Sequence, residues 1–476
     1  MSSTIDHARE EHHDFLNASQ QALENPRLQS ALVRLTDTLM AGNRRGYAAL
    51  ADSSDLRDHA KRIKQHALAH LDRYLEQMEA SVIKLGGKVH WASTAEDARR
   101  ILVEIARTTN SRRIVKSKSM TTEEIHLNPA LEEAGMEVTE TDFGEFIIQL
   151  AGERPSHLVA PAVHHTRESI AKLLSDHTGE TQPDDPQLLA KVGRRLLREK
   201  FARADMGISG ANFGIAETGT VVLITNEGNG RLTTTCPRVH VAIMGMEKVI
   251  PRLIDLPVFL KLLARGATGQ NLSVYTTVIT GPRRAGERDG PEEFHLVLLD
   301  NGRSRVLATP FRESLQCIRC GACLNACPVY RRIGGHAYGG VYSGPIGSIL
   351  TPLYDSVKDN PHLPHASSLC GACQSACPVK INIPHMLIGL RELQTHQKGT
   401  KSWSEKVAYG LAAAVLRRPW LYRLALRMAR LTLRPFARED WLKRMPGPGA
   451  PWTRSRDFPA PARRSFREQW RDLSRL

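Results

Sequence analysis

Apolar residues recur at helical spacing at the start of the chain, and further on they gather in short continuous runs. Residues 1 to about 75 have helical apolar spacing and few helix-breaking residues. From about residue 80 to residue 300, apolar runs alternate with helical segments of about 10 to 15 residues, which predicts an α/β domain with a largely parallel sheet. The predicted strands are 89–92, 113–116, 146–150, 157–160, 220–225, 239–244 and 294–299, and the predicted helices are 95–108, 121–134 and 186–206.

Two of these segments carry signals for where elements begin and end. The helix over 121–134 starts at Thr121-Thr-Glu-Glu124, which is a capping-box pattern. Strand 294–299 is expected to close the sheet, after the loop Thr280–Pro291. The pattern then predicts short helices that carry cysteines, followed by a helical basic segment. We therefore expect four parts, listed in chain order: a helical region over 1–75, an α/β domain over 76–307, a cysteine module over 308–392 and a basic helical region over 393–476.

Length and composition narrow the class of protein. The 476 residues, of which 41% are apolar, are enough for two to four domains with sizeable cores. The first ten residues have no basic-then-apolar signal pattern, and no run of 18 or more apolar residues predicts a membrane span. Eight cysteines are too few for a disulfide scaffold of this length. The default expectation is a cytoplasmic protein.

The net charge of +15 is concentrated near the C-terminus. Residues 401–476 hold 18 lysines and arginines against 6 aspartates and glutamates, a net charge of +12. Arg423, Arg427, Arg430 and Arg434 lie within about 60° of one another on a helical wheel. Such a face suits an acidic partner or anionic lipid, so peripheral contact with the inner face of the membrane is an expectation. A helix packed on its own domain is the alternative.

Seven of the eight cysteines lie between Cys317 and Cys377. The first run, Cys317 to Pro328, has the C-x2-C-x2-C-x3-C-P spacing of a bacterial [4Fe–4S] site. The second run, Cys370 to Pro378, has the same spacing without the first cysteine. Zinc is the alternative for any C-x2-C pair, but four cysteines at relative positions 0, 3, 6 and 10 are not a zinc pattern. The sequence predicts two [4Fe–4S] clusters.

In paired runs of this kind, the cysteine before the proline ligates the other cluster. The predicted ligands of cluster 1 are Cys317, Cys320, Cys323 and Cys377, and those of cluster 2 are Cys327, Cys370 and Cys373. Cluster 2 lacks one cysteine, and Ser367 stands three residues before Cys370. The fourth position is either a substituted ligand that tunes the potential, with Ser367, His365 or water as candidates, or an open iron; we favour tuning. Gly321 and Gly371 let backbone amides approach the sulfides.

Other candidate sites are weaker. Cys236 is expected to be an ordinary buried cysteine. Gly228-Asn-Gly230 follows a strand, but Thr233 replaces the third glycine and no helix is expected, so we predict a turn and neither NAD nor FAD. Anionic ligands in open α/β sheets bind at positions such as Lys116–Ser119 and Glu217–Gly219. The simpler interpretation is a loop whose polar groups are hydrogen-bonded within the protein. His164-His165 is expected to be a solvent-exposed turn.

The order of these parts resembles the lactate utilisation protein B family over nearly the whole chain. Gly214-Ile-Ala-Glu-Thr-Gly-Thr-Val-Val-Leu223 lies in the α/β part, ahead of the two cysteine runs and the basic tail. The cysteine spacings match that family, including the three-cysteine second run. The resemblance implies a LUD domain, similar in fold to ribose-5-phosphate isomerase and CoA-transferase proteins. The 42 residues between the two cysteine motifs, 328–369, are too many for a compact two-cluster ferredoxin hairpin and suit a helical ferredoxin-like module. The resemblance also implies two sister proteins in the oxidation of L-lactate to pyruvate. It fixes no catalytic residue.

The expected function is that of an iron–sulfur electron-transfer subunit in a multi-subunit L-lactate dehydrogenase, non-catalytic or co-catalytic, passing electrons to an unknown acceptor. The clusters alone cannot take a hydride, so a two-electron site lies elsewhere or is shared with partners. The alternatives are the iron–sulfur subunit of another 2-hydroxy acid oxidase of the glycolate type, a nucleic-acid-binding protein and a regulatory sensor. The large α/β domain favours lactate. The tail has no recognisable nucleic-acid module, so no nucleic acid is expected.

Overall fold

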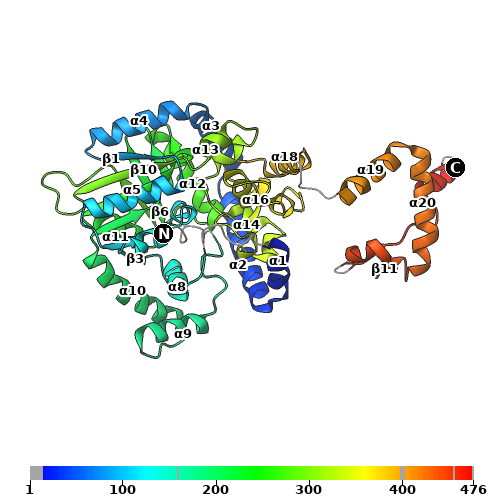
Figure 1. Ribbon diagram of the computed structural model, residues 1–476, viewed down its shortest axis with the longest axis horizontal. Helices are drawn as coiled ribbons and strands as arrows, with labels where there is room; N and C mark the ends of the chain where they lie inside the picture. Colours follow the sequence, from blue (N-terminus) through cyan, green and yellow to red (C-terminus); the bar gives the residue numbers. More distant parts are fainter. Residues whose placement is uncertain (1–13, 158–159, 397–402, 454–455, 474–476) are drawn as a thin grey trace, which may run out of the picture. The chain divides into compact units, whose positions relative to one another are not determined.

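The computed structural model describes residues 14–157, 160–396, 403–453 and 456–473. Contacts divide the chain into two compact units, Met1–Gln394 and Thr395–Leu476. The first unit holds the α/β domain and the cysteine-rich segment (Figure 1). No helix in the described ranges has the length and apolar character that a membrane crossing needs.

A six-stranded sheet, parallel throughout, forms the centre of the α/β domain. The strand order is β1-β10-β7-β4-β2-β3. The strands are β1 (Lys88–Ala92), β2 (Arg113–Lys116), β3 (Glu137–Glu140), β4 (Met206–Ser209), β7 (Val239–Gly245) and β10 (Glu293–Leu299). The parallel sheet is therefore as predicted, but strand 294–299 lies inside it, between β1 and β7. Strands β3 and β4 are short, and the sequence pattern did not reveal them.

A second sheet has the order β8-β5-β6-β9, and some of its buried residues share a core with residues of β7 and β10. Its strands are β5 (Phe213–Ile215), β6 (Thr220–Thr225), β8 (Val249–Ile250) and β9 (Tyr275–Ile279). Strand β6 pairs with β5 and β9 in antiparallel fashion. The predicted strand 220–225 is correct, but it belongs to this sheet and not to the parallel one.

Helices cover both faces of the parallel sheet (Figure 1). Strand β7 shows the division: Val241 and Ile243 pack with α5, whereas Ala242 and Met244 pack with α4. This follows from the alternation of side chains along a strand. The helices of the domain are α4 (Leu71–Lys84), α5 (Ala95–Thr108), α6 (Met120–Glu124), α7 (Leu127–Glu133), α8 (Phe143–Ala151), α9 (Arg167–Thr178), α10 (Pro186–Arg203), α11 (Asn229–Thr235) and α12 (Leu256–Ala267).

Three local predictions need correction. Segment 146–150 is not a strand but the middle of α8, which Asp142 caps at one end and Gly152 ends in a left-handed conformation. The predicted helix 121–134 is two helices, α6 and α7, because His126 has φ +49°. Ser119 and not Thr121 caps α6, because its hydroxyl accepts the amide hydrogen of Thr122. The predicted strand 157–160 falls partly outside the described residues.

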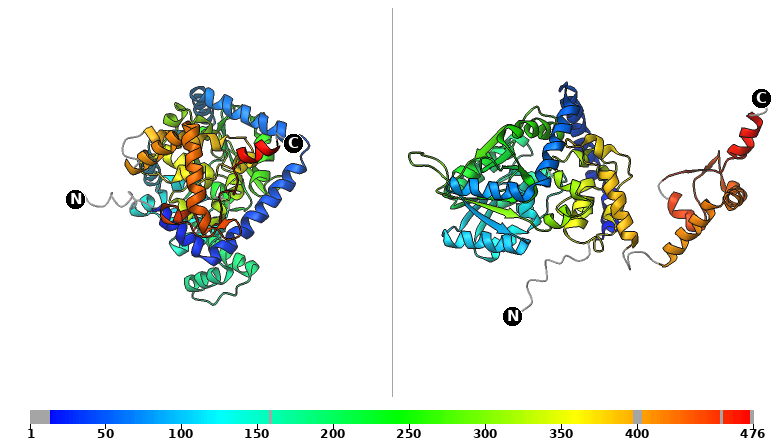
Figure 2. Two further views of the ribbon diagram at one scale, coloured as in Figure 1. Left: turned by 90° about the vertical axis from the view of Figure 1, so that its right-hand side faces the viewer. Right: turned by 90° about the horizontal axis from the view of Figure 1, so that it is seen from above.

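The N-terminal helices pack against the cysteine-rich segment (Figures 1 and 2). They are α1 (Phe15–Glu24), α2 (Pro26–Ala48) and α3 (Ser53–Ala69). Leu32 of α2 shares one buried core with five of the cysteines. Helices α2 and α12 approach closely at Gly42, where a Cβ atom would lie 2.6 Å from the Thr268 carbonyl oxygen. The helical prediction for residues 1–75 is confirmed over 15–75, except for short connections, and these helices frame the cysteine site.

The remaining helices belong to the cysteine-rich segment and the second unit. The first group is α13 (Arg303–Leu307), α14 (Ala322–Ala326), α15 (Tyr330–Ile333), α16 (Gly344–Tyr354), α17 (Ala372–Ala376) and α18 (Ile383–His396). The second unit contains α19 (Trp403–Arg417), α20 (Pro419–Leu433), α21 (Phe466–Leu473) and the short strands β11 (Trp441–Leu442) and β12 (Phe458–Pro459).

We expect a buried histidine to make the fold sensitive to acid. His240 on β7 is buried, its Nε2 lies 2.8 Å from Ser209 Oγ, and burial lowers its pKa from 6.5 to about 3. A depressed histidine pKa adds stability that is full above pH 6.5 and is lost as the pH falls towards 3. His240→Asn should therefore reduce the loss of unfolding free energy between pH 7 and pH 5 by about 2 kcal/mol. Urea denaturation at both pH values measures this; an unchanged pH dependence would contradict the assignment.

Candidate iron–sulfur centres and an adjoining pocket

The two cysteine runs adopt the same backbone turn. Arg319 and Leu369, each just before a cysteine, have φ values of +58° and +55°. Gly321 and Gly371 follow at +77° and +80°, and each begins a short helix, α14 or α17, that carries the next cysteine. Helices α14 and α17 pack together. Glycine fits these positions because it adopts positive φ without steric cost.

The turns bring the cysteines together in two groups. Cys317, Cys320, Cys323 and Cys377 line one cavity, so the last cysteine of the second run joins three from the first. Cys327, Cys370 and Cys373 lie close enough that each thiolate would raise the pKa of a neighbouring thiol, and they form the other group. Cys370 is exposed, whereas Cys327 and Cys373 are buried. These groups are the sets that the spacing predicted.

The sulfur atoms are too far apart for a single small ion. Tetrahedral zinc with Zn–S bonds of about 2.3 Å needs thiolates that lie about 3.8 Å from one another. All seven cysteines belong to the described part of the chain, and no three of their sulfurs lie within 4.8 Å of one another. A cubane holds its thiolates at wider separation, so the donor spacing fits a cluster better than zinc.

Backbone amides donate hydrogen bonds to the sulfurs. Arg319 N lies 3.4 Å from Cys317 Sγ, and Ile381 N lies 3.4 Å from Cys377 Sγ. Burial raises the pKa of the Cys373 thiol to about 12 and that of Cys377 to about 11, so without cations these groups keep their protons. Iron would supply the positive charge that lets them ionise, while the amides stabilise the sulfur charge.

Ser367 occupies the same place in its turn as Cys317 does in the other. Its Oγ accepts a hydrogen bond of 3.1 Å from Leu369 N, just as Cys317 Sγ accepts one from Arg319 N. His365, the other candidate side chain, lies in a short 3-10 helix, and its Nε2 is 3.0 Å from Gln394 Oε1. The geometry therefore favours Ser367 over His365.

A pocket of about 270 Å³ connects the parallel sheet with the first group of cysteines. Residues that follow β2, β3 and β4 line one side, and Cys320 and Arg319 line another. Open α/β sheets bind ligands at the carboxyl ends of their strands, where this pocket lies. A small molecule bound there would lie beside the first group of cysteines.

Positive side chains line this pocket. Lys118 Nζ is buried, lies 3.3 Å from Glu145 Oε1 and makes no hydrogen bond in the described structure. Arg319 Nη1 likewise has no hydrogen-bond partner among the described residues. Lys248 donates to the Ala211 carbonyl, and burial lowers its pKa to about 8. Buried donors without partners are costly, so an anionic group in this pocket would satisfy them.

Lys116, the other lysine of the predicted anion site, is already paired with two carboxylates. Lys116 is buried and its Nζ lies 2.7 Å from Glu140 and 2.9 Å from Glu123. Although burial opposes the charged form, these two carboxylates raise the pKa of Lys116. Glu217 accepts the amide hydrogen of Leu253, which is also a structural role. Within the Lys116–Ser119 segment, Lys118 and Ser119 line the pocket, whereas Lys116 does not.

A buried ion network joins the α/β domain to the cysteine segment. Arg303 is fully buried and its guanidinium contacts Glu124 at 2.8 Å and Glu247 at 2.6 Å. Glu247 also lies 3.4 Å from Arg319, and Tyr342 donates to Glu124 at 2.5 Å. This network fixes Arg319 next to the cysteines.

Three weaker predictions turn out differently in the structure. Cys236 is exposed, so the expectation of a buried cysteine is wrong. Gly228-Asn-Gly230 is not a simple turn, because α11 begins at Asn229. That helix has only seven residues. His164 and His165 do lie in a turn, but their side chains are only 16% and 14% exposed.

Several residues that line these sites carry no recognisable signal in the sequence. Arg319 and Lys248 are single basic residues in ordinary contexts, and only the meeting of two domains makes them neighbours of Cys320. Glu153 lies beside His164 and His165 through the fold of a loop. The paired histidines were the only available signal.

None of the residues of the tail helix α20 is buried, although a few are only partly exposed. Arg423, Arg427 and Arg430 lie on α20, and Arg434 follows its last residue. Two of these four arginines contact acids within the same unit: Arg430 lies 3.5 Å from Glu468, and Arg434 lies 3.1 Å from Asp440. Exposed apolar side chains on this helix include Leu424, Met428 and Leu431.

Family models match three consecutive parts of the chain. Residues 75–299 match the LUD domain, residues 313–381 match a 4Fe-4S dicluster domain, and residues 390–474 match the C-terminal domain of lactate utilisation protein B. A solved structure of a DUF162 family protein from Deinococcus radiodurans is 14% identical to this chain, and the match covers 48% of this chain and 98% of that one with a TM-score of 0.28.

Curated relatives match the chain nearly from end to end. Lactate utilization protein B of Bacillus velezensis is 45% identical over 96% of both chains. The protein of the same name from Bacillus subtilis is 44% identical over 96% of both chains, and that of Lysinibacillus sphaericus is 45% identical over 95% of both. This agreement covers the α/β domain, both cysteine runs and the tail. The chain therefore belongs to the lactate utilisation protein B family.

Proposed function

We propose that this chain is the iron–sulfur electron-transfer subunit of a multi-subunit L-lactate dehydrogenase system that oxidises L-lactate to pyruvate. The names of the relatives support the substrate. The observation that carries the proposal is the pocket that reaches from the carboxyl edge of the sheet to Cys320. In this arrangement a small acid bound by the LUD domain lies next to an iron–sulfur centre.

We assign two [4Fe–4S] clusters to the two cysteine groups. Cluster 1 takes Cys317, Cys320, Cys323 and Cys377, and cluster 2 takes Cys327, Cys370 and Cys373 with Ser367 as its fourth ligand. When bound, each cluster exchanges one electron at a time, whereas lactate oxidation releases two electrons and two protons. The two-electron step therefore belongs to a site shared with two sister proteins.

The protein's own residues have two tasks in this proposal. Lys118 and Arg319 hold the carboxylate of the hydroxy acid, because each has a buried donor atom without a hydrogen-bond partner in the described structure. Exposed Cys370 leaves cluster 2 accessible to an electron acceptor. The exposed arginines of α20 give the tail a surface for an acidic partner. The alternative is contact of the same arginines with the inner face of the membrane.

We further propose that the cysteine segment is a helical ferredoxin-like module, since short helices α14 and α17 carry the two turns. The likeness of the LUD domain to ribose-5-phosphate isomerase and CoA-transferase proteins belongs to the same proposal. The parallel sheet with helices on both faces supports it.

The pocket is tested by calorimetric titration of the full chain, prepared without oxygen, with L-lactate. Lys118→Met should weaken lactate binding by about tenfold or more, since a charge-assisted hydrogen bond contributes about 1.5–3 kcal/mol. Lys172→Met, which changes an exposed lysine on α9, is the matched control and should bind as the unmodified protein does. Absence of lactate binding, or equal binding by both variants, contradicts this role. Tighter binding of glycolate would favour the glycolate-type alternative.

The fourth ligand of cluster 2 is tested at Ser367. Ser367→Ala should lose one iron and show a [3Fe–4S] signal by EPR, because alanine has no ligand atom. Ser367→Cys should retain four irons in that cluster, and Ser375→Ala, at an exposed serine on α17, is the control. A persistent [3Fe–4S] signal in the unmodified protein would instead support an open iron.

A further inference from the structure

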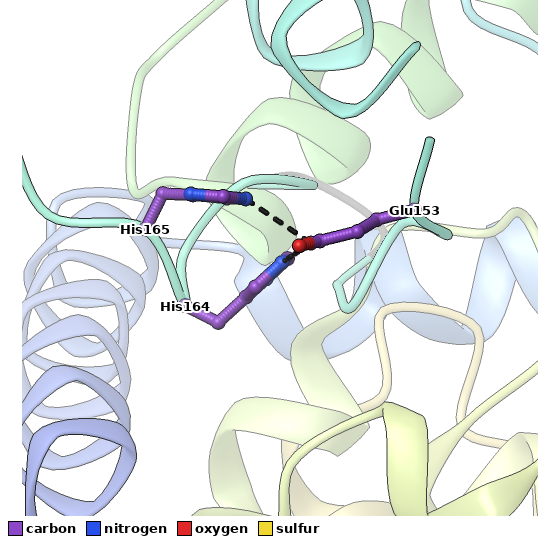
Figure 3. A group of neighbouring side chains, drawn as sticks. All are labelled: Glu153, His164 and His165. Atoms are coloured by element: carbon purple, nitrogen blue, oxygen red, sulfur yellow. Dashed lines mark hydrogen bonds and ion pairs between the residues drawn. The ribbon is translucent and has the colours of Figure 1, made fainter. Parts of the chain in front are cut away.

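A loop of the α/β domain brings Glu153, His164 and His165 together, away from the cysteines in sequence (Figure 3). Their three ligand atoms all lie within 4.8 Å of one another. His164 Nε2 is 2.6 Å from Glu153 Oε2, and His165 Nε2 is 3.1 Å from the same oxygen. Both rings therefore point the same nitrogen at one carboxylate oxygen, as the dashed lines in Figure 3 show.

The other nitrogen of each ring is held by a serine. His164 Nδ1 lies 3.0 Å from Ser156 Oγ, and His165 Nδ1 lies 3.2 Å from Ser169 Oγ. Each serine hydroxyl has one hydrogen, and both are already donated to carbonyl oxygens, that of Ser156 to Pro161 and that of Ser169 to Thr166. When each serine hydroxyl donates to its carbonyl oxygen, it accepts from the ring, and in that tautomer each Nδ1 carries a hydrogen.

This assignment leaves a bare lone pair on each Nε2 of a neutral ring, facing an anionic oxygen. Such an arrangement is repulsive unless positive charge lies between the three atoms. Protons on both nitrogens would create two imidazolium rings whose centroids are 4.6 Å apart, with His336 a further 4.7 Å from His164. A metal ion removes this repulsion with one charge centre, and a histidine ligand held at its other nitrogen is the usual arrangement in metal sites.

We propose that Glu153, His164 and His165 bind a divalent first-row transition metal ion, independently of the iron–sulfur clusters. Two imidazole nitrogens and one carboxylate oxygen suit zinc and iron(II). Glu153 and His164 also line a cavity of about 730 Å³ between the α/β domain and residues 335–343. Three protein ligands leave coordination positions open towards this cavity, as in metal sites that bind small molecules.

Zinc titration of the full chain, purified without oxygen and with its clusters intact, tests this proposal. Calorimetry should show about one Zn²⁺ bound per chain beyond the iron of the clusters. Glu153→Gln and His165→Ala should each weaken this binding by about tenfold or more. His126→Asn is the matched control, because it alters a histidine of the same cavity outside the group and asparagine readily adopts its positive φ.

Iron content and circular dichroism of each variant show whether the fold and clusters are intact. Glu153 is 42% exposed, so its substitution leaves the core unchanged. The proposal is supported if the two ligand variants lose zinc binding while they keep their iron and His126→Asn keeps both. It is overturned if the unmodified chain binds no zinc, or if all three variants bind it equally. Lactate binding is a separate measurement, so failure here leaves the proposed function standing.

Discussion

Replacing Arg303 with methionine is expected to destabilise the protein by about 3–5 kcal/mol, because it breaks a buried ion pair. The side chain is fully buried and its guanidinium contacts both Glu124 and Glu247. Burial alone would raise the pKa of Glu247, but the charges of Arg303 and Arg319 outweigh it and lower the pKa to about 2. Without Arg303, two buried carboxylates keep their charge with too few partners.

Urea denaturation at pH 7 measures this effect. Arg100→Met is the matched control, because Arg100 lies on the exposed face of α5, pairs with Asp97 at 3.4 Å and is 65% exposed. A surface pair of this kind contributes less than about 1 kcal/mol. Equal free energies of unfolding for the two variants would show that the ion network contributes no net stability. Since Arg319 belongs to the network, loss of lactate binding in Arg303→Met would also link stability to the pocket.

The second large effect is the loss of a whole cluster when one cysteine is removed, with a crossed pattern between the two runs. Cys377→Ala, in the second run, should remove the same cluster as Cys320→Ala in the first. Cys327→Ala, in the first run, should remove the same cluster as Cys373→Ala in the second. The structure supports this because Cys377 lines the cavity of the first run, whereas Cys327 interacts with Cys370.

Iron analysis and EPR of the dithionite-reduced variants distinguish this crossed pattern from one in which each cysteine run holds its own cluster. Each variant should lose about four of eight irons, and the two pairs should leave different residual signals. Cys236→Ser is the matched control, since this exposed cysteine lies outside both runs and should retain all the iron. If Cys377→Ala left the signal that Cys373→Ala leaves, each run would hold its own cluster and the crossed assignment would be wrong.

The sequence predicted best those features whose signals are local. Helix 95–108 was predicted with the bounds that the structure has, because Thr94 caps it and its apolar residues recur on one face. The cysteine groups followed from spacing alone. Segment 146–150 failed because a short apolar run does not distinguish a strand from a buried helix. Here Asp142 and Gly152 decide for a helix, and they lie outside the run.

The pocket and the histidine group were not predictable in the same way. Lys118 and Arg319 are about 200 residues apart and meet only because the cysteine segment packs on the carboxyl edge of the sheet. Lys116 was an equally good candidate from its sequence, yet two carboxylates neutralise it. Which of two nearby lysines is left to bind a ligand depends on long-range packing, which no local pattern reports.

The measurement that tests the central claim most directly is the iron and acid-labile sulfide content of the full chain purified without oxygen. Two cubanes predict about eight irons and eight sulfides per chain, with a visible charge-transfer absorption and an EPR signal on reduction. A colourless protein that holds zinc without sulfide at Cys317–Cys377 would contradict the electron-transfer function proposed for this chain.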